Sequence, residues 1–181
     1  MQAFPLPEEI SVPESGWPRY GFTVALVRIL VDGYSLLHAW PELAPGKARH
    51  SAPAREALIR ALTRYHDAAG TPVTVIFDGS GAPPGTPKLP STREVEVLYS
   101  TAGKTADQLI ERAAYRLRSY GDVLVITDDY AERDTVIGLG GMAQSCAVFI
   151  EQLAGASQEL KSDVKQHNLR ERERFRKAQM S

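Results

Sequence analysis

Four aspartates stand beside the predicted core elements of this chain, and carboxylates in that pattern could hold a metal ion. Three follow short apolar runs and the fourth opens a predicted helix: Asp32, Asp78, Asp128 and Asp107. Any one of them could be explained as a turn residue or a helix cap, but four at the same edge of a predicted sheet are harder to explain in this way. Clustered carboxylates repel unless a cation lies among them, and hard oxygen ligands favour Mg²⁺ or Mn²⁺. Because such an ion activates bound water and stabilises charge on a phosphoryl oxygen, the pattern predicts hydrolysis of a phosphodiester.

The acids converge only if the apolar runs are parallel strands of one sheet. Three runs rich in β-branched residues precede the aspartates, and a further run alternates apolar and polar residues, as expected near a sheet edge: 27–31, 73–77, 123–126 and 94–99. Amphipathic segments over 54–65 and 106–117 separate them. This alternation predicts an α/β fold with a parallel sheet, whose strands share one carboxyl edge where ligands bind.

Local chemistry offers a simpler role for two of the acids. Thr105 and Gln108 predict a capping box, and Asp107 in that first turn complements the helix dipole. Either Asp128 or Asp129 would cap the helix after the strand before them. These roles and metal binding both stay open at this point.

The composition is that of a soluble globular protein. The 181 residues are 43% hydrophobic and 24% charged, with a net charge of −1. No apolar run approaches the roughly 20 residues that cross a bilayer, and no secretory signal is present, so we expect a cytoplasmic protein without a membrane partner. The single cysteine, Cys146, has apolar neighbours and is expected to be a buried thiol.

Three segments are expected along the chain. They are an irregular, proline-containing extension over 1–25, an α/β domain over 26–156 and a basic helix or tail over 157–181. Residues 161–181 hold seven basic and three acidic side chains. Arg170, Arg172 and Arg174 in this tail either lie on a solvated helix or bind the phosphates of a nucleic acid.

Other phosphate chemistry lacks its motifs. No G-x-G-x-x-G follows the first apolar run, and neither a P-loop nor a G-x-S-x-G nucleophile elbow is present. A haloacid-dehalogenase type of phosphatase would need a second aspartate two residues after Asp32, where Tyr34 stands.

Five ordered segments resemble the successive motifs of the YacP-type NYN-domain family of PIN-like ribonucleases. They are DGYSLLHAWP at 32–41, VIFD at 75–78, VEVLY at 95–99, TAD at 105–107 and VITD at 125–128. The resemblance implies a PIN-like three-layer domain with a central, mostly parallel sheet flanked by helices. It also implies that Asp32, Asp107 and Asp128 bind the metal in the active site, with Asp78 beside them.

Two positions depart from the family pattern. The family usually has asparagine where this chain has Ser35, so a side-chain amide near the scissile phosphate becomes a shorter hydroxyl. It usually has an acid where this chain has Lys104. Both side chains are expected to contact the substrate.

The leading prediction is a Mg²⁺- or Mn²⁺-dependent endoribonuclease that hydrolyses single-stranded RNA or mRNA, with the ribosome as a candidate partner. Retention of all four acids favours this enzyme. The main alternative is a catalytically weak or inactive RNA- or ribosome-binding module on the same fold, which Ser35 and Lys104 favour. A third hypothesis is a hydrolase of a small phosphorylated substrate, for which an acidic body is no handicap.

Overall fold

The computed structural model describes residues 26–79, 88–101, 103–158, 166 and 170. The predicted extension over 1–25 and most of the tail over 157–181 lie outside the described residues, Arg172 and Arg174 among them. In the described ranges, no helix has the length and apolar character needed to cross a bilayer.

Five parallel strands form the central sheet, with β1 in its middle. In order across the sheet they are β3 (Val95–Tyr99), β2 (Val73–Phe77), β1 (Leu26–Asp32), β4 (Asp122–Ile126) and β5 (Met142–Gln144). The four predicted strands and the edge position of β3 are confirmed. Strand β5 was not predicted, because its three half-buried residues form no apolar run.

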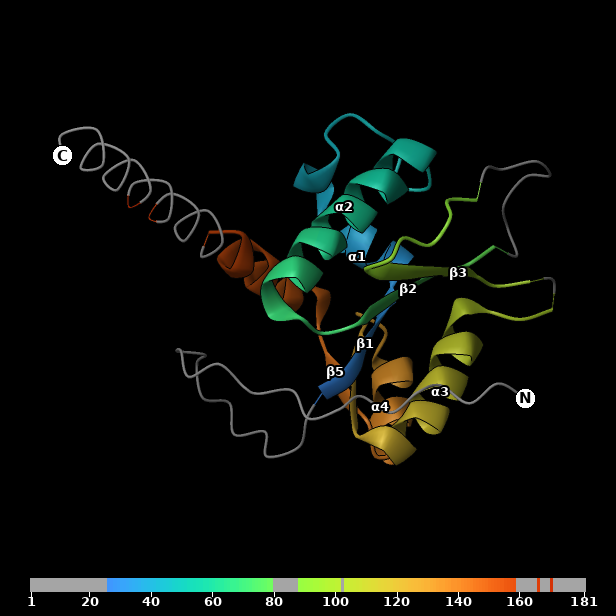
Figure 1. The fold of residues 1–181 in the computed structure, drawn as a ribbon. Helices are drawn as coiled ribbons and strands as arrows, with labels where there is room; N and C mark the ends of the chain where they lie inside the picture. Colours follow the sequence, from blue (N-terminus) through green and yellow to red (C-terminus); the bar gives the residue numbers. More distant parts are fainter. Residues whose placement is uncertain (1–25, 80–87, 102, 159–165, 167–169, 171–181) are drawn as a thin grey trace, which may run out of the picture.

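Helices cover both faces of this sheet. They are α1 (Gly33–Ala39), α2 (Ala52–Ala69), α3 (Ala106–Leu117), α4 (Tyr130–Gly138) and a helix over 146–158, with short 3₁₀ turns η1 (Pro41–Leu43) and η2 (Arg118–Tyr120). Figure 1 shows α1 and α2 on one side of the sheet and α3 and α4 on the other. The helix over 146–158 packs on the α2 side, where the rings of Tyr65 and Phe149 have centroids 5.3 Å apart. The predicted three-layer α/β architecture is thus confirmed.

Strand β1 is buried from both sides. Its alternate residues point to opposite faces, so Ile29 and Val31 join the core cluster under α2, whereas Leu30 joins the cluster under α3. The strand is therefore fixed in position, and its last residue, Asp32, emerges at a defined point of the carboxyl edge.

Three helices begin at this edge with side-chain caps. Asp32 caps α1, Thr105 caps α3 in the predicted capping box with Gln108, and Asp129 caps α4. Capping satisfies backbone N–H groups that have no partner in the first turn, so the caps fix where these helices start. The carboxyl edge therefore gathers the first turns of α1, α3 and α4.

Replacement of Gly33 by alanine should destabilise this edge. A Cβ atom at Gly33 would lie 2.3 Å from Cε1 of the buried Phe77 ring, which is itself packed between Tyr34 and Tyr99. We expect Gly33→Ala to lower the free energy of unfolding by about 1–3 kcal/mol, measured by urea denaturation. Gly155→Ala is the matched control, because nothing lies within 4 Å of its Cβ position. Equal stability of Gly33→Ala and the wild type would contradict the close packing described here.

Candidate metal centre

Asp32 is held in one orientation by the residues that follow it. Its Oδ1 accepts hydrogen bonds from the backbone N–H groups of Tyr34 (3.1 Å) and Ser35 (3.3 Å). Its Oδ2 accepts a hydrogen bond of 2.6 Å from the Ser35 hydroxyl. Asp32 is thus a helix cap, as the simpler explanation of this residue requires, and its carboxylate is also fixed at the end of β1.

Two further carboxylates meet Asp32 at this edge. Asp107 comes from the first turn of α3 and Glu132 from the first turn of α4. One carboxylate oxygen from each of the three residues lies within 4.8 Å of the other two. This geometry, with three oxygen ligands from three elements, matches the hard-ligand preference of Mg²⁺ and Mn²⁺.

Glu132 was not singled out from the sequence. An acid in the first turn of a helix is ordinarily explained by the helix dipole, and Glu132 stands among other acids. The available signal is its spacing from Val136, because both lie on the buried stripe of α4. A carboxylate on a buried stripe needs a partner, which is the argument that could have found it.

The environment of this group favours protonated acids when no cation is present. Burial raises the pKa of Glu132 to about 7, and the charges of Asp32, Asp107 and Asp129 act in the same direction. The Thr127 hydroxyl offsets part of this rise. The pKa of Asp107 is also raised, first by burial and then by the charge of Asp32.

These carboxylates have no positively charged partner among the described residues. Glu132 is 3% exposed, and in the described part of the chain only the Thr127 hydroxyl acts on its carboxylate as a donor, without reaching full hydrogen-bond geometry. No described lysine or arginine forms an ion pair with Asp32, Asp107 or Glu132. The donor set therefore fits a divalent cation, which would compensate the buried charge.

The other two predicted acids lie on the same edge with different contacts. Asp78 accepts a hydrogen bond of 2.7 Å from the Ser100 hydroxyl. Asp128 accepts one of 2.9 Å from the backbone N–H of Cys146, whose side chain is buried as predicted, and lies 3.9 Å from the Arg133 guanidinium. The structure thus groups Asp32 and Asp107 with Glu132, whereas a ligand role for Asp128 stays a prediction.

The predicted substrate-binding residues fall in separate places. Ser35 bonds Asp32, as described above, so its hydroxyl holds a carboxylate in place. Lys104 is exposed immediately before the cap of α3. Arg170 is helical and exposed, and Arg172 and Arg174 lie outside the described residues. Contact of these side chains with substrate is a prediction that the contacts within the chain do not test.

Replacement of Glu132 by glutamine should remove a pH dependence of stability. Because the pKa of about 7 in the folded protein exceeds the unfolded value of 4.5, the unfolded chain releases this proton first as the pH rises. In EDTA, the contribution of Glu132 should be fully present below pH 4.5 and fall by on the order of 3 kcal/mol as the pH reaches about 7.

Urea denaturation of the wild type and Glu132→Gln between pH 5 and 8 measures this difference. Glu151→Gln serves as the control, because Glu151 is exposed on the helix over 146–158. Parallel stability profiles for the wild type and Glu132→Gln would show that Glu132 does not titrate as described.

Comparisons with known proteins assign the family. Residues 29–181 match the family of the YacP-like NYN domain. The uncharacterized protein YacP of Bacillus subtilis is 32% identical over 126 residues, which are 69% of this chain and 74% of that protein. Two crystal structures of Rae1 (YacP) from Bacillus subtilis, one of a single-residue variant, share the fold with a TM-score of 0.68. They are 28% (the variant) and 26% identical, and the alignments cover 79% and 81% of this chain and 84% of each matched chain. The chain therefore belongs to the YacP-like NYN domain family, whose PIN-like fold indicates a nuclease-type function on RNA.

Proposed function

We propose that this protein is a divalent-metal-dependent endoribonuclease whose ion is held by Asp32, Asp107 and Glu132. The observation that carries this proposal is the convergence of three carboxylates within 4.8 Å, one of which, Glu132, is buried without a cationic partner among the described residues. A surface built only to bind RNA phosphates would be weakened by such a cluster, because like charges repel. With a divalent cation in place, the same cluster attracts a phosphate.

The residues around the cluster prepare it for this reaction. Mg²⁺ or Mn²⁺ would supply a water of lowered pKa and stabilise charge on the phosphoryl oxygens. Three hydrogen bonds keep the Asp32 carboxylate in its orientation before any substrate arrives. Ser35 supplies one of them through its hydroxyl, so it is proposed to position a ligand where the family usually has asparagine.

RNA is the proposed substrate because of the family, and an internal bond is proposed because of the surroundings of the centre. Asp128, Asp129 and Tyr130 are exposed beside the buried Glu132. A single-stranded RNA could therefore pass along this side of the centre and present one of its internal phosphodiester bonds. Single-stranded RNA or mRNA, with the ribosome as partner, is the proposed class of substrate.

Basic side chains outside the centre are proposed to attract the RNA backbone. Lys104 is exposed beside the start of α3, which carries Asp107, and Arg170 is exposed in the tail. The tail over 161–181 is basic, with seven basic and three acidic side chains, whereas the net charge of the whole chain is −1. Phosphate contacts of this kind would supply affinity without sequence preference.

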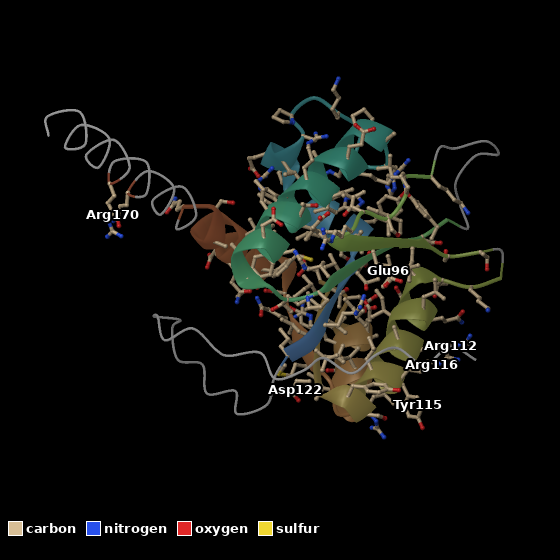
Figure 2. The ribbon with its side chains drawn as sticks, in the orientation of Figure 1. Glu96, Arg112, Tyr115, Arg116, Asp122 and Arg170 are labelled. Carbon is tan, nitrogen blue, oxygen red and sulfur yellow. The ribbon has the colours of Figure 1, made fainter. Side chains whose placement is uncertain are left out.

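Removal of any one proposed ligand should abolish metal-dependent cleavage. We expect Asp32→Asn, Asp107→Asn and Glu132→Gln each to lower the rate on a single-stranded RNA oligonucleotide in Mn²⁺ by at least about 100-fold, because each removes a charge that holds the ion. Asp122→Asn is the matched control, since Asp122 begins β4 at the amino edge of the sheet (Figure 2). Cleavage by all three variants at the wild-type rate would refute the proposal.

Calorimetric titration with Mn²⁺ separates the ligand sets. Glu132→Gln should lose Mn²⁺ binding, whereas Asp128→Asn should keep it, because the Asp128 carboxylate bonds the Cys146 amide instead. Loss of Mn²⁺ binding in Asp128→Asn, with binding kept in Glu132→Gln, would show that Asp128 rather than Glu132 is a metal ligand. Wild-type protein that binds RNA but does not cleave it in Mg²⁺ or Mn²⁺ would support the alternative of a binding module.

A further inference from the structure

An exposed aromatic residue begins α4, the helix that carries Glu132. Tyr130 is the first residue of α4 and is 76% exposed. It directly follows Asp129, whose charge acts on both Asp107 and Glu132, and it precedes Glu132 by two residues. The tyrosine ring is a large apolar surface with a polar hydroxyl, and at Tyr130 most of it is accessible to a ligand.

The ring of Tyr130 is held from one side by Arg133. The guanidinium carbon of Arg133 lies 4.5 Å from the centroid of the ring, which is a cation–π contact. Because the residue is 76% exposed, the opposite face of the ring is open to solvent. The pair thus presents one open aromatic face on the first turn of α4, the helix that carries Glu132.

Arg133 is itself anchored to the rigid edge of the sheet. Its Nη2 donates a hydrogen bond of 3.3 Å to the backbone carbonyl of Asp128 and lies 3.9 Å from the Asp128 carboxylate. The Asp128 carboxylate is fixed in turn by the backbone N–H of Cys146. The side chain of Arg133 is only 22% exposed. A chain of contacts therefore runs from the segment after β4 to the ring, which limits the freedom that Tyr130 would lose on binding a ligand.

We propose that the open face of Tyr130 stacks on a base of the RNA next to the scissile phosphate, with Arg133 as the positioning residue that holds the ring. This inference rests on the proposed function of the same site. Aromatic rings bind single-stranded RNA by stacking on unpaired bases, and an arginine at the ring adds a cation–π contribution. Because every base has a flat face, the stack selects unpaired nucleotides rather than a sequence. The preferred substrate is then RNA with an unstacked base beside the bond that is cut.

A second pair of the same kind provides an internal comparison. Tyr115 is 56% exposed and Arg118 lies 5.0 Å from its ring centroid, with the same spacing of three residues. Figure 2 shows Tyr115 at the end of the molecule where Asp122 begins β4, which is the amino edge of the sheet. This pair has the chemistry of Tyr130 and Arg133 but lies away from the carboxylates, so Tyr115 is the matched control.

Binding and kinetics of four variants test the stack. Fluorescence anisotropy with a labelled single-stranded RNA in Ca²⁺, a hard cation that also takes carboxylate ligands, gives Kd, and steady-state cleavage in Mn²⁺ gives KM and kcat. We expect Tyr130→Ala to raise Kd and KM by roughly 5- to 150-fold, with kcat changed far less. Tyr130→Phe and Tyr130→Trp should keep values near those of the wild type, because both retain a ring, and Tyr115→Ala should change neither constant.

Removal of single bases from the RNA identifies the partner of the ring. In a series of oligonucleotides with one abasic position each, one position next to the cleaved bond should weaken binding to the wild type. The same abasic RNA should bind Tyr130→Ala as well as the intact RNA does, because the stack is then already lost. An equal effect of every abasic position on both proteins would overturn the inference.

The outcomes distinguish this inference from the proposed function. Wild-type cleavage with unchanged Kd and KM in Tyr130→Ala would overturn the stack alone. Loss of binding in Tyr130→Ala that neither Phe nor Trp restores would assign the residue a structural role and also overturn it. If RNA binding depends on the Tyr130 ring but the wild type does not cleave RNA, the stack is supported and the proposed nuclease activity is refuted. Absence of both binding and cleavage in the wild type would overturn both.

Discussion

Mutual repulsion among Asp32, Asp107 and Glu132 is the constraint on which the rest of this site depends. Two unit charges about 4 Å apart repel by about 4 kcal/mol at the effective dielectric constant near a protein surface, and burial of Glu132 increases the cost of its charge. Either a proton or a cation must offset this repulsion near neutral pH. Without a cation, protonation of Glu132 relieves the repulsion, as its raised pKa shows. A bound divalent ion relieves it with all three acids ionised, and it also gives the site a chemical use.

The fold holds these like charges together by fixing each carrier separately. Strand β1 is buried on both faces, so the backbone at Asp32 cannot move away from its neighbours. The capping box of α3 and the Asp129 cap of α4 set the start of the helices that carry Asp107 and Glu132. Because β1 pairs with both β2 and β4 in parallel, the segments after these strands reach one edge. Core packing thus holds the three carboxylates close together against their mutual repulsion.

Much of this arrangement is predictable from local sequence, and the remainder depends on tertiary contacts. The strands before Asp32 and Asp78 are visible as apolar runs, and the start of α3 is visible in Thr105 and Gln108. Glu132 was missed, because an acid in a first helical turn has a local explanation and its burial follows only from packing of α4. The choice between Asp128 and Asp129 as the cap could not be made from sequence. It depends on the backbone N–H of Cys146, 18 residues further on, which bonds Asp128 and leaves Asp129 to cap α4. Strand β5 was missed because three half-buried residues carry no periodic signal.

The most direct test of this account is a crystal structure of the protein with Mn²⁺, located by its anomalous scattering. We expect one ion among Asp32, Asp107 and Glu132, with an oxygen of each at about 2.1 Å, close to the distance typical of Mg²⁺. An ion held by Asp128 or Asp78 without Glu132, or no ion at this edge in saturating Mn²⁺, would contradict it.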